Sequence, residues 1–303
     1  MKKNLTLVYI CLVLAMVFWG FSFVGTKICL DVISPITLVF LRLIVSVIFL
    51  FTLTKVLGIL QPIKKNDLKW FLLITFFEPL LYFLGETFGL KLVSSTLGAV
   101  LITTIPLFVP WAAWIIFREK VYLLNLLGII ISIVGVILII VENDFSFKVS
   151  IPGILLLMVA VFSAVGYSMV LRHIAHSYSP ITIVTWQNLF GLFSFFPLFM
   201  IFDFQSLQLS QFNATVIYNI IALGVFPSSI SYMFFAYGVR EIGINRASIF
   251  SNLIPVITAI IAFYFMDESL PFLKIIGIII VIFALSISQL KKISIKPQKN
   301  NPA

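Results

Sequence analysis

Three charged residues lie within long apolar stretches of a chain that has little charge elsewhere. They are Arg42, Glu78 and Glu86, in a sequence of 303 residues of which 61% are hydrophobic and 10% are charged. A charge inside a membrane-spanning segment costs several kcal/mol unless it is paired or in contact with water, and such residues commonly mark substrate or proton pathways. We therefore expect these three residues to serve in substrate binding or in coupling.

A stripe of polar side chains connects the two glutamates. Glu78, Tyr82 and Glu86 recur every four residues, which places them on one broad helix face that we expect to line a cavity. At a rise of 1.5 Å per residue, Glu78 lies ~12 Å and Glu86 ~24 Å from the start of the predicted helix at Trp70. Arg42 lies ~10 Å from the opposite boundary, so its depth is compatible with an ion pair to either glutamate. A purely structural salt bridge is the alternative role for Arg42.

The chemistry available to Glu78 follows from its depth. Desolvation disfavours the charged form of a carboxyl group, so a buried glutamate can hold a proton. Glu78 can then carry a proton in one direction while a substrate moves in the other, or it can neutralise the amino group of a substrate. Because it lies nearer mid-depth than Glu86, it is the stronger candidate.

The elements that position these residues are predicted to be ten transmembrane helices. The composition excludes a water-soluble globule and a disordered chain, and backbone groups in lipid are satisfied within helices. Short polar segments separate apolar stretches of about 20 residues each. The predicted helices are Leu5–Val24, Pro35–Leu57, Trp70–Leu90, Thr96–Phe117, Leu123–Val141, Ile151–Leu171, Pro180–Phe202, Ala214–Val239, Ile244–Met266 and Phe272–Leu290.

The distribution of Lys and Arg predicts the orientation. Of the 20 basic residues, 15 fall on one side when both termini are placed in the cytoplasm. Lys27, Lys91, Lys148 and Lys274 fall on the other side, and Arg42 lies within a span. The net charge of +9 therefore reflects topology and not nucleic-acid binding. Without a cleavable signal or targeting extension, a bacterial-type inner membrane is the simplest location.

The sequence also contains an internal repeat. The tetrapeptide Ser-Pro-Ile-Thr at 34–37 recurs at 179–182, and Pro106 and Glu119 have counterparts in Pro255 and Glu268. This divides the chain into repeats at 1–146 and 147–290 and a basic cytoplasmic tail at 291–303. Five helices per repeat is an odd number, so the second repeat enters the membrane from the opposite side. Such inverted repeats recur in secondary transporters.

Several motifs give the chain its resemblance to a known family. They are Phe18-Trp19-Gly20, Phe40-Leu41-Arg42, Ile105-Pro106-Leu107, Arg118-Glu119-Lys120, Gly128 and Gly135, followed in the second repeat by Ile254-Pro255-Val256, Asp267-Glu268-Ser269 and Gly277. The chain departs from the pattern at Ala284, where a second glycine is expected. Over nearly its whole length the chain resembles the EamA-type branch of the drug/metabolite transporter superfamily. The resemblance implies ten helices, a central cavity lined mainly by helices 1, 3, 4, 6, 8 and 9, and usually export of small metabolites.

Further side chains on the implied lining helices suit an amphipathic solute. Besides the charged residues, we expect Trp19, Thr103, Tyr167, Tyr232 and Asn252 to contribute to substrate binding, although each taken alone also fits ordinary helix packing. The polar residues at 186–188 lie on helix 7, which the resemblance places outside the cavity.

Residues that obey the repeat are expected to be architectural. Pro106 and Pro255 kink their helices at matched depths and serve either as packing kinks or as gating hinges. Glu119 and Glu268 each begin the helix that follows a kinked one, where a carboxylate complements the helix dipole. Both are therefore read as structural residues.

The predicted function is a secondary transporter of small organic metabolites, with amino acids or related compounds as substrates. It works by alternating access in the export direction, and protons are the candidate coupling ion. Multidrug efflux is the alternative within carriers. An intramembrane enzyme and a channel are less consistent with the sequence, which has no HExxH or GxSxG motif and no segment like a selectivity filter. We expect no cofactor and no metal site; the oligomeric state stays open.

Overall fold

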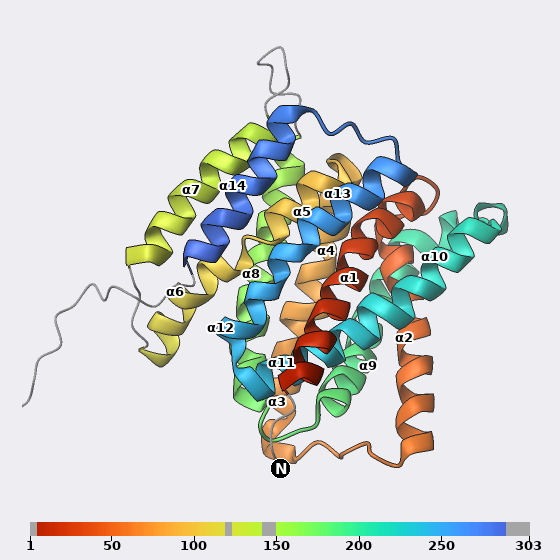
Figure 1. The fold of residues 1–303 in the computed structure, drawn as a ribbon. Coiled ribbons are helices and arrows are strands. Elements are labelled where there is room, and N and C mark those ends of the chain that lie inside the picture. Colours follow the sequence, from red (N-terminus) through yellow and green to blue (C-terminus); the bar gives the residue numbers. More distant parts are fainter. Residues whose placement is uncertain (1–4, 119–122, 141–149, 289–303) are drawn as a thin grey trace, which may run out of the picture.

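The computed structural model describes residues 5–118, 123–140 and 150–288, and these residues form helices joined by short loops (Figure 1). Glu119 and the tail at 291–303, for which predictions were made above, lie outside the described residues. The α-helices are α1 (Leu5–Leu30), α2 (Pro35–Leu57), α3 (Leu68–Thr75), α4 (Tyr82–Leu92), α5 (Ser95–Ile102), α6 (Ile105–Phe117), α7 (Leu123–Ile140), α8 (Ile151–Ile174), α9 (Pro180–Leu198), α10 (Ala214–Val225), α11 (Tyr232–Ile242), α12 (Ile244–Ala247), α13 (Leu253–Phe265) and α14 (Phe272–Ser288).

Shorter helical turns of other types lie between or within these helices. Three are π-helical, namely η2 (Phe76–Leu81), η3 (Phe199–Asp203) and η6 (Phe226–Ser231). The 3-10 turns are η1 (Lys65–Asp67), η4 (Phe204–Ser206), η5 (Leu209–Gln211) and η7 (Ser248–Asn252). No β-strand occurs in the part of the chain that the structure describes.

Seven helical stretches are long and apolar enough to cross a membrane, and three shorter apolar helices accompany them. The seven are Leu5–Leu30, Pro35–Leu57, Lys65–Leu92, Ser95–Phe117, Ile151–Ile174, Pro180–Ser206 and Ala214–Ile242. The shorter ones are Leu126–Ile139, Phe250–Phe265 and Phe272–Ala284. The chain is therefore an all-helical, multi-pass membrane protein.

Matching caps begin the helices of the repeated tetrapeptide. Ser34 precedes α2 and Ser179 precedes α9, and each hydroxyl accepts a hydrogen bond from the backbone N–H three residues later. A proline follows each serine at the first helical position, where its missing N–H costs nothing. The recurring tetrapeptide thus encodes a helix start.

One helix pair packs along an edge of the bundle. Figure 1 shows α7 and α14 side by side, away from α2, α9 and α10. Their contact depends on two glycines, because a Cβ atom added at Gly135 would lie 2.9 Å from the carbonyl oxygen of Gly277. The small residues allow the two backbones to approach closely.

Two of the predicted continuous helices are interrupted, which the sequence analysis did not anticipate. The predicted span Trp70–Leu90 consists of α3, η2 and α4, and the predicted span Ala214–Val239 consists of α10, η6 and α11. Each interruption contains a proline, Pro79 or Pro227, which cannot donate a backbone hydrogen bond. The breaks predicted from Pro106 and Pro255 are found, between α5 and α6 and at η7 before α13.

Glu268 caps a different helix from the one we predicted. Its carboxylate accepts hydrogen bonds from the backbone N–H of Ser95 (2.7 Å) and Thr96 (3.3 Å) and from the Thr96 hydroxyl (2.7 Å), at the start of α5. It is therefore structural, as expected, but it stabilises α5 and not the helix that follows it in sequence. Nearby, the Lys27 ammonium donates to the carbonyl oxygens of Leu90 (2.6 Å) and Val93 (2.8 Å) at the end of α4.

The Glu268 cap generates a first prediction. Replacing Glu268 by Ala removes three acceptor contacts and should lower the free energy of unfolding by about 0.5–2 kcal/mol, whereas Glu268→Gln keeps one acceptor oxygen and should lose less. Thermal unfolding of the purified protein in detergent measures both. Asp31→Asn, which removes an exposed carboxylate at the same end of the bundle, is the control. Equal melting temperatures for Glu268→Ala and the control would contradict the assignment.

Candidate functional site

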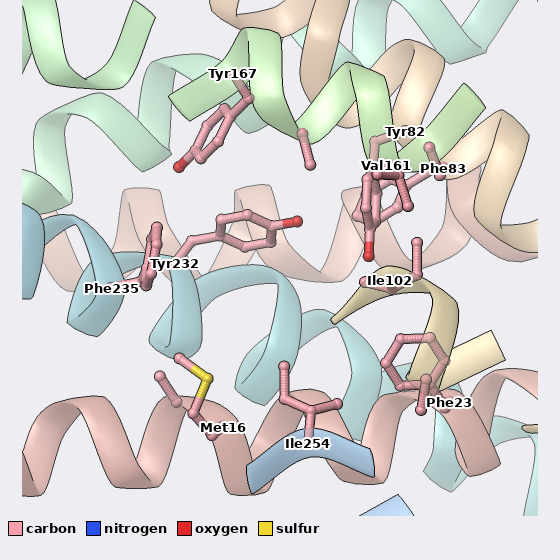
Figure 2. Packing of buried hydrophobic residues seen from close by; sticks show 14 of the residues in the cluster. Met16, Phe23, Tyr82, Phe83, Ile102, Val161, Tyr167, Tyr232, Phe235 and Ile254 are labelled. Carbon is pink, nitrogen blue, oxygen red and sulfur yellow. The ribbon is translucent and has the colours of Figure 1, made fainter. Parts of the chain in front are cut away.

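A cavity lies between the helices, and both halves of the chain line it. Its walls come from α1, α2, η2, α4, the end of α5, the start of α6 and the break between them, α8, α11, η7 and the start of α13. Of the nine residues predicted for binding or coupling, eight line this one cavity: Trp19, Arg42, Glu78, Tyr82, Glu86, Thr103, Tyr167 and Tyr232. Figure 2 shows the side chains of Tyr82, Tyr167 and Tyr232 directed into the space between the helices.

Glu78 reaches the cavity from the interruption of its helix and not from a regular helical face. Its backbone is extended (φ −146°, ψ 120°), so the four-residue spacing that suggested a stripe is valid for Tyr82 and Glu86 but not for Glu78. The carbonyl oxygen of Phe77 beside it accepts a hydrogen bond of 2.5 Å from the hydroxyl of Ser163 on α8. Proline at position 79 was the available signal, because the residue before a proline avoids the α conformation.

Two glycines make room for this interruption. A Cβ atom at Gly166 of α8 would lie 2.5 Å from the ring of Phe77, and one at Gly191 of α9 would lie 2.2 Å from Cγ of Pro79. Helices α8 and α9 therefore hold the irregular segment from two sides. This support keeps Glu78 buried at the cavity wall, with 3% of its surface exposed.

Glu86 is engaged by two partners. The Tyr82 hydroxyl donates a hydrogen bond of 3.1 Å to Oε1, and Nη1 of Arg42 lies 4.0 Å from Oε2. The predicted depth of Arg42 allowed an ion pair with either Glu78 or Glu86, and in the structure Arg42 pairs with Glu86. Among the described residues, Glu78 has no hydrogen bond and no ion pair, although it interacts electrostatically with Glu86 and Arg42.

A polar cluster missed by the sequence analysis positions Arg42. Its Nε donates a hydrogen bond of 2.9 Å to the Ser228 hydroxyl, and its guanidinium lies 4.3 Å from the ring centre of Phe83. Asn188 on α9 donates to the Ser228 carbonyl oxygen and to the Ser46 hydroxyl, both at 2.7 Å. Helix α9 lies outside the cavity lining, as the resemblance implied, but it fixes a residue of the lining. The serine after Pro227, at a second helix interruption, was the signal in the sequence.

Aromatic rings form a continuous wall on another side of the cavity. Trp19 meets Tyr232 at 5.2 Å and Phe235 at 5.3 Å between ring centres, and Tyr167 meets Tyr232 at 6.0 Å. The buried Tyr167 hydroxyl has no hydrogen-bond partner within the described part of the chain. The wall is apolar apart from the hydroxyl groups of Tyr167 and Tyr232, which Figure 2 shows together with the ring of Phe235.

The remaining predicted residues differ in their placement. Pro106 lines the cavity beside Thr103, whose hydroxyl bonds to its own helix at Val100 (2.9 Å). Asn252 is not part of the lining, because its amide donates to the Ser286 hydroxyl on α14 at 3.3 Å. Pro255 also lies outside the lining.

The arrangement is suited to binding and to proton transfer. Within the described residues, no group of three or more His, Cys, Asp and Glu side chains lies close enough to hold a metal ion. The cavity contains two carboxylates, one guanidinium, hydroxyls and aromatic rings. A mostly apolar lining with a few convergent polar groups of this kind is typical of sites that hold an ionised or amphipathic solute.

The glycine contacts generate a second prediction. Gly191→Ala should destabilise the protein by about 1–3 kcal/mol, because the added methyl group overlaps the Pro79 ring. Pro79→Ala in the same chain removes the overlapping ring atoms and should recover part of the loss, as a double-mutant cycle in thermal unfolding will measure. Ser194→Ala on the same helix is the control. Additive effects of the two substitutions would contradict the contact.

Comparisons with known proteins agree with this architecture. The model of the EamA-like transporter family matches residues 6–141 and again residues 151–289. An uncharacterized transporter of Archaeoglobus fulgidus is 28% identical over 269 residues, covering 89% of this chain and 94% of the relative. The uncharacterized transporter YdfC of Bacillus subtilis is 25% identical, covering 96% and 94%. A protein of known crystal structure shares the fold with a TM-score of 0.67 at 12% identity, covering 91% of this chain and 98% of that one.

Proposed function

The chain belongs to the EamA-like transporter family, and from this premise we propose that it is a secondary carrier that exports small organic metabolites by alternating access. The observation that carries the proposal is the central cavity, in which carboxylates of one half face aromatic rings and hydroxyls of the other. Amino acids or related compounds are the proposed substrates. A small-molecule substrate and a lipid environment follow from the family itself.

The two halves are proposed to be inverted five-helix repeats, 1–146 and 147–290, that together make ten spans. Support comes from the two separate matches to one family model and from the proline-containing interruptions η2 and η6 in the third span of each half. Two similar halves have two nearly equivalent packings, and exchange between them moves the cavity from one membrane face to the other. Pro106 and Pro255 are the proposed hinges. The distribution of basic residues supports cytoplasmic termini in an inner membrane.

Protons are the proposed coupling ion, and Glu78 is the proposed proton carrier. The charged and titratable groups around it are Glu86, Arg42, Tyr82 and Tyr167. Glu86 is engaged by Tyr82 and Arg42, so Glu78 is the carboxyl group left to exchange a proton with a substrate. Either a proton or a bound cation would neutralise its buried charge.

Multidrug efflux remains the second candidate within carriers. The specific observation in its favour is the aromatic wall of Trp19, Tyr167, Tyr232 and Phe235, which offers contact area without directional hydrogen bonds. A cavity that accepts bulky hydrophobic cations as readily as small metabolites would favour this function.

Counterflow distinguishes a carrier from a channel and is a third prediction. Proteoliposomes preloaded with unlabelled phenethylamine or phenylalanine should accelerate uptake of the same labelled compound above that of empty vesicles, because only a carrier exchanges substrate across the membrane. Vesicles without protein are the control. If neither compound accelerates the uptake of its labelled form, the proposed carrier function is contradicted.

The fourth prediction concerns Glu78. In Glu78→Gln, a pH gradient should no longer drive transport, whereas counterflow at saturating substrate and equal pH should continue, because the exchangeable proton is lost but the cavity is kept. Labelled uptake in proteoliposomes, with and without a gradient, measures both. Transport by this variant that still depends on the pH gradient would contradict proton coupling at Glu78.

A further inference from the structure

The cavity contains one carboxylate more than it contains cations. Glu78 and Glu86 are acidic, Arg42 is the basic residue of the lining, and Arg42 lies next to Glu86. We propose that the cavity selects an organic amine with a single positive charge and no carboxylate, held with its ammonium group on Glu78. This inference rests on the proposed function and narrows its substrates, amino acids or related compounds, to the amines.

The first step of the argument is that Glu78 is available. Its carboxylate has no hydrogen bond and no ion pair among residues 5–118, 123–140 and 150–288, and it lines the cavity. A buried carboxylate without an ion-pair partner is costly, so a ligand that brings one positive charge is stabilised by neutralising it. A protonated amine supplies both the charge and hydrogen-bond donors.

The second step is that Arg42 already has Glu86 as its counter-charge. Its Nε donates to Ser228, its Nη1 lies 4.0 Å from Glu86 without a hydrogen-bond partner among the described residues, and one face of the guanidinium covers Phe83. The carboxylate of an amino acid placed at this guanidinium would share it with Glu86. Three carboxylates would then lie with one guanidinium and one ammonium group, so one buried negative charge would stay without a counter-charge, which is costly in a protein interior. The carboxylate of an amino acid is thus selected against.

The third step is that the opposite wall suits the apolar part of an amine. The rings of Trp19, Tyr232 and Tyr167 form a contiguous surface from α1, α11 and α8. Aromatic faces attract cations as well as apolar groups, so they contribute to both ends of such a ligand. A hydroxyl on the ligand would find the unpartnered Tyr167 hydroxyl.

The test compares three probes with the same phenyl group, using the purified full-length protein. Phenethylamine carries one positive charge, phenylalanine adds a carboxylate, and 2-phenylethanol carries no charge. Titration calorimetry at neutral pH should give phenethylamine a Kd at least about tenfold lower than phenylalanine, a difference of about 1.4 kcal/mol. Phenylalanine binding as tightly as phenethylamine, or no phenethylamine binding, would overturn the proposal. This comparison uses the unaltered protein and needs no variant to fold.

A variant pair then assigns the effect to Glu78. Glu78→Gln should weaken phenethylamine binding at least about tenfold and leave 2-phenylethanol binding unchanged, because only the charge has been removed. Asp31→Asn removes an exposed carboxylate outside the cavity and should change neither Kd. If Glu78→Gln keeps the affinity for phenethylamine, the ammonium position is wrong.

Binding and counterflow together separate this inference from the proposed function. Selective binding of phenethylamine without counterflow of either probe would support the inference and contradict the carrier. Counterflow of both probes with equal affinity would support the carrier and contradict the inference.

Discussion

A backbone carbonyl that loses its helical partner inside a membrane must find another donor, because the surrounding lipid offers none. At η2 the carbonyl of Phe77 accepts from the backbone N–H of Tyr82, five residues later, and also from the hydroxyl of Ser163, and glycines at 166 and 191 let α8 and α9 close around the irregular segment. The second half of the chain thus supports the interruption with one hydrogen bond and with two close glycine contacts. Because Glu78 lies in the interruption, its position at the cavity wall depends on the same contacts.

The charges follow from a second constraint, that a buried ion needs a partner. Arg42 joins elements from both halves, since it bonds to Ser228 of η6 and lies beside Glu86 of α4. Asn188 holds Ser228 in turn, so the guanidinium has a fixed direction. The pairing of Arg42 with Glu86 leaves Glu78 as the acidic group that a proton or a ligand can neutralise.

Which features of the fold and the site could be predicted depended on how far apart in sequence the interacting residues lie. The scarcity of charge was enough to identify Arg42, Glu78 and Glu86, and the repeated tetrapeptide identified two helix starts, because these signals are local. The partner of Glu268 and the direction of the Asn252 side chain depend on which helices pack against each other. Helical spacing predicts which residues share a face of a helix, but not which other helix contacts that face. The interruption at Glu78 was readable from Pro79, but the Ser163 hydroxyl that bonds to the Phe77 carbonyl lies 86 residues away in sequence.

The difference between the two interrupted helices bears on how transport is coupled. Both η2 and η6 contain a proline, but η2 carries a carboxylate where η6 carries the hydroxyls of Ser228 and Ser229. With Glu78 ionised and empty, the cavity has an unbalanced negative charge, and closing it off from water on both sides is costly. A proton or a monovalent amine on Glu78 removes that imbalance equally well. An amino acid does not neutralise it, since its own charges cancel. Under the proposed function, this electrostatic cost prevents the carrier from changing conformation while Glu78 is ionised and the cavity is empty. Because a proton or an amine removes the cost, the carrier exchanges one for the other.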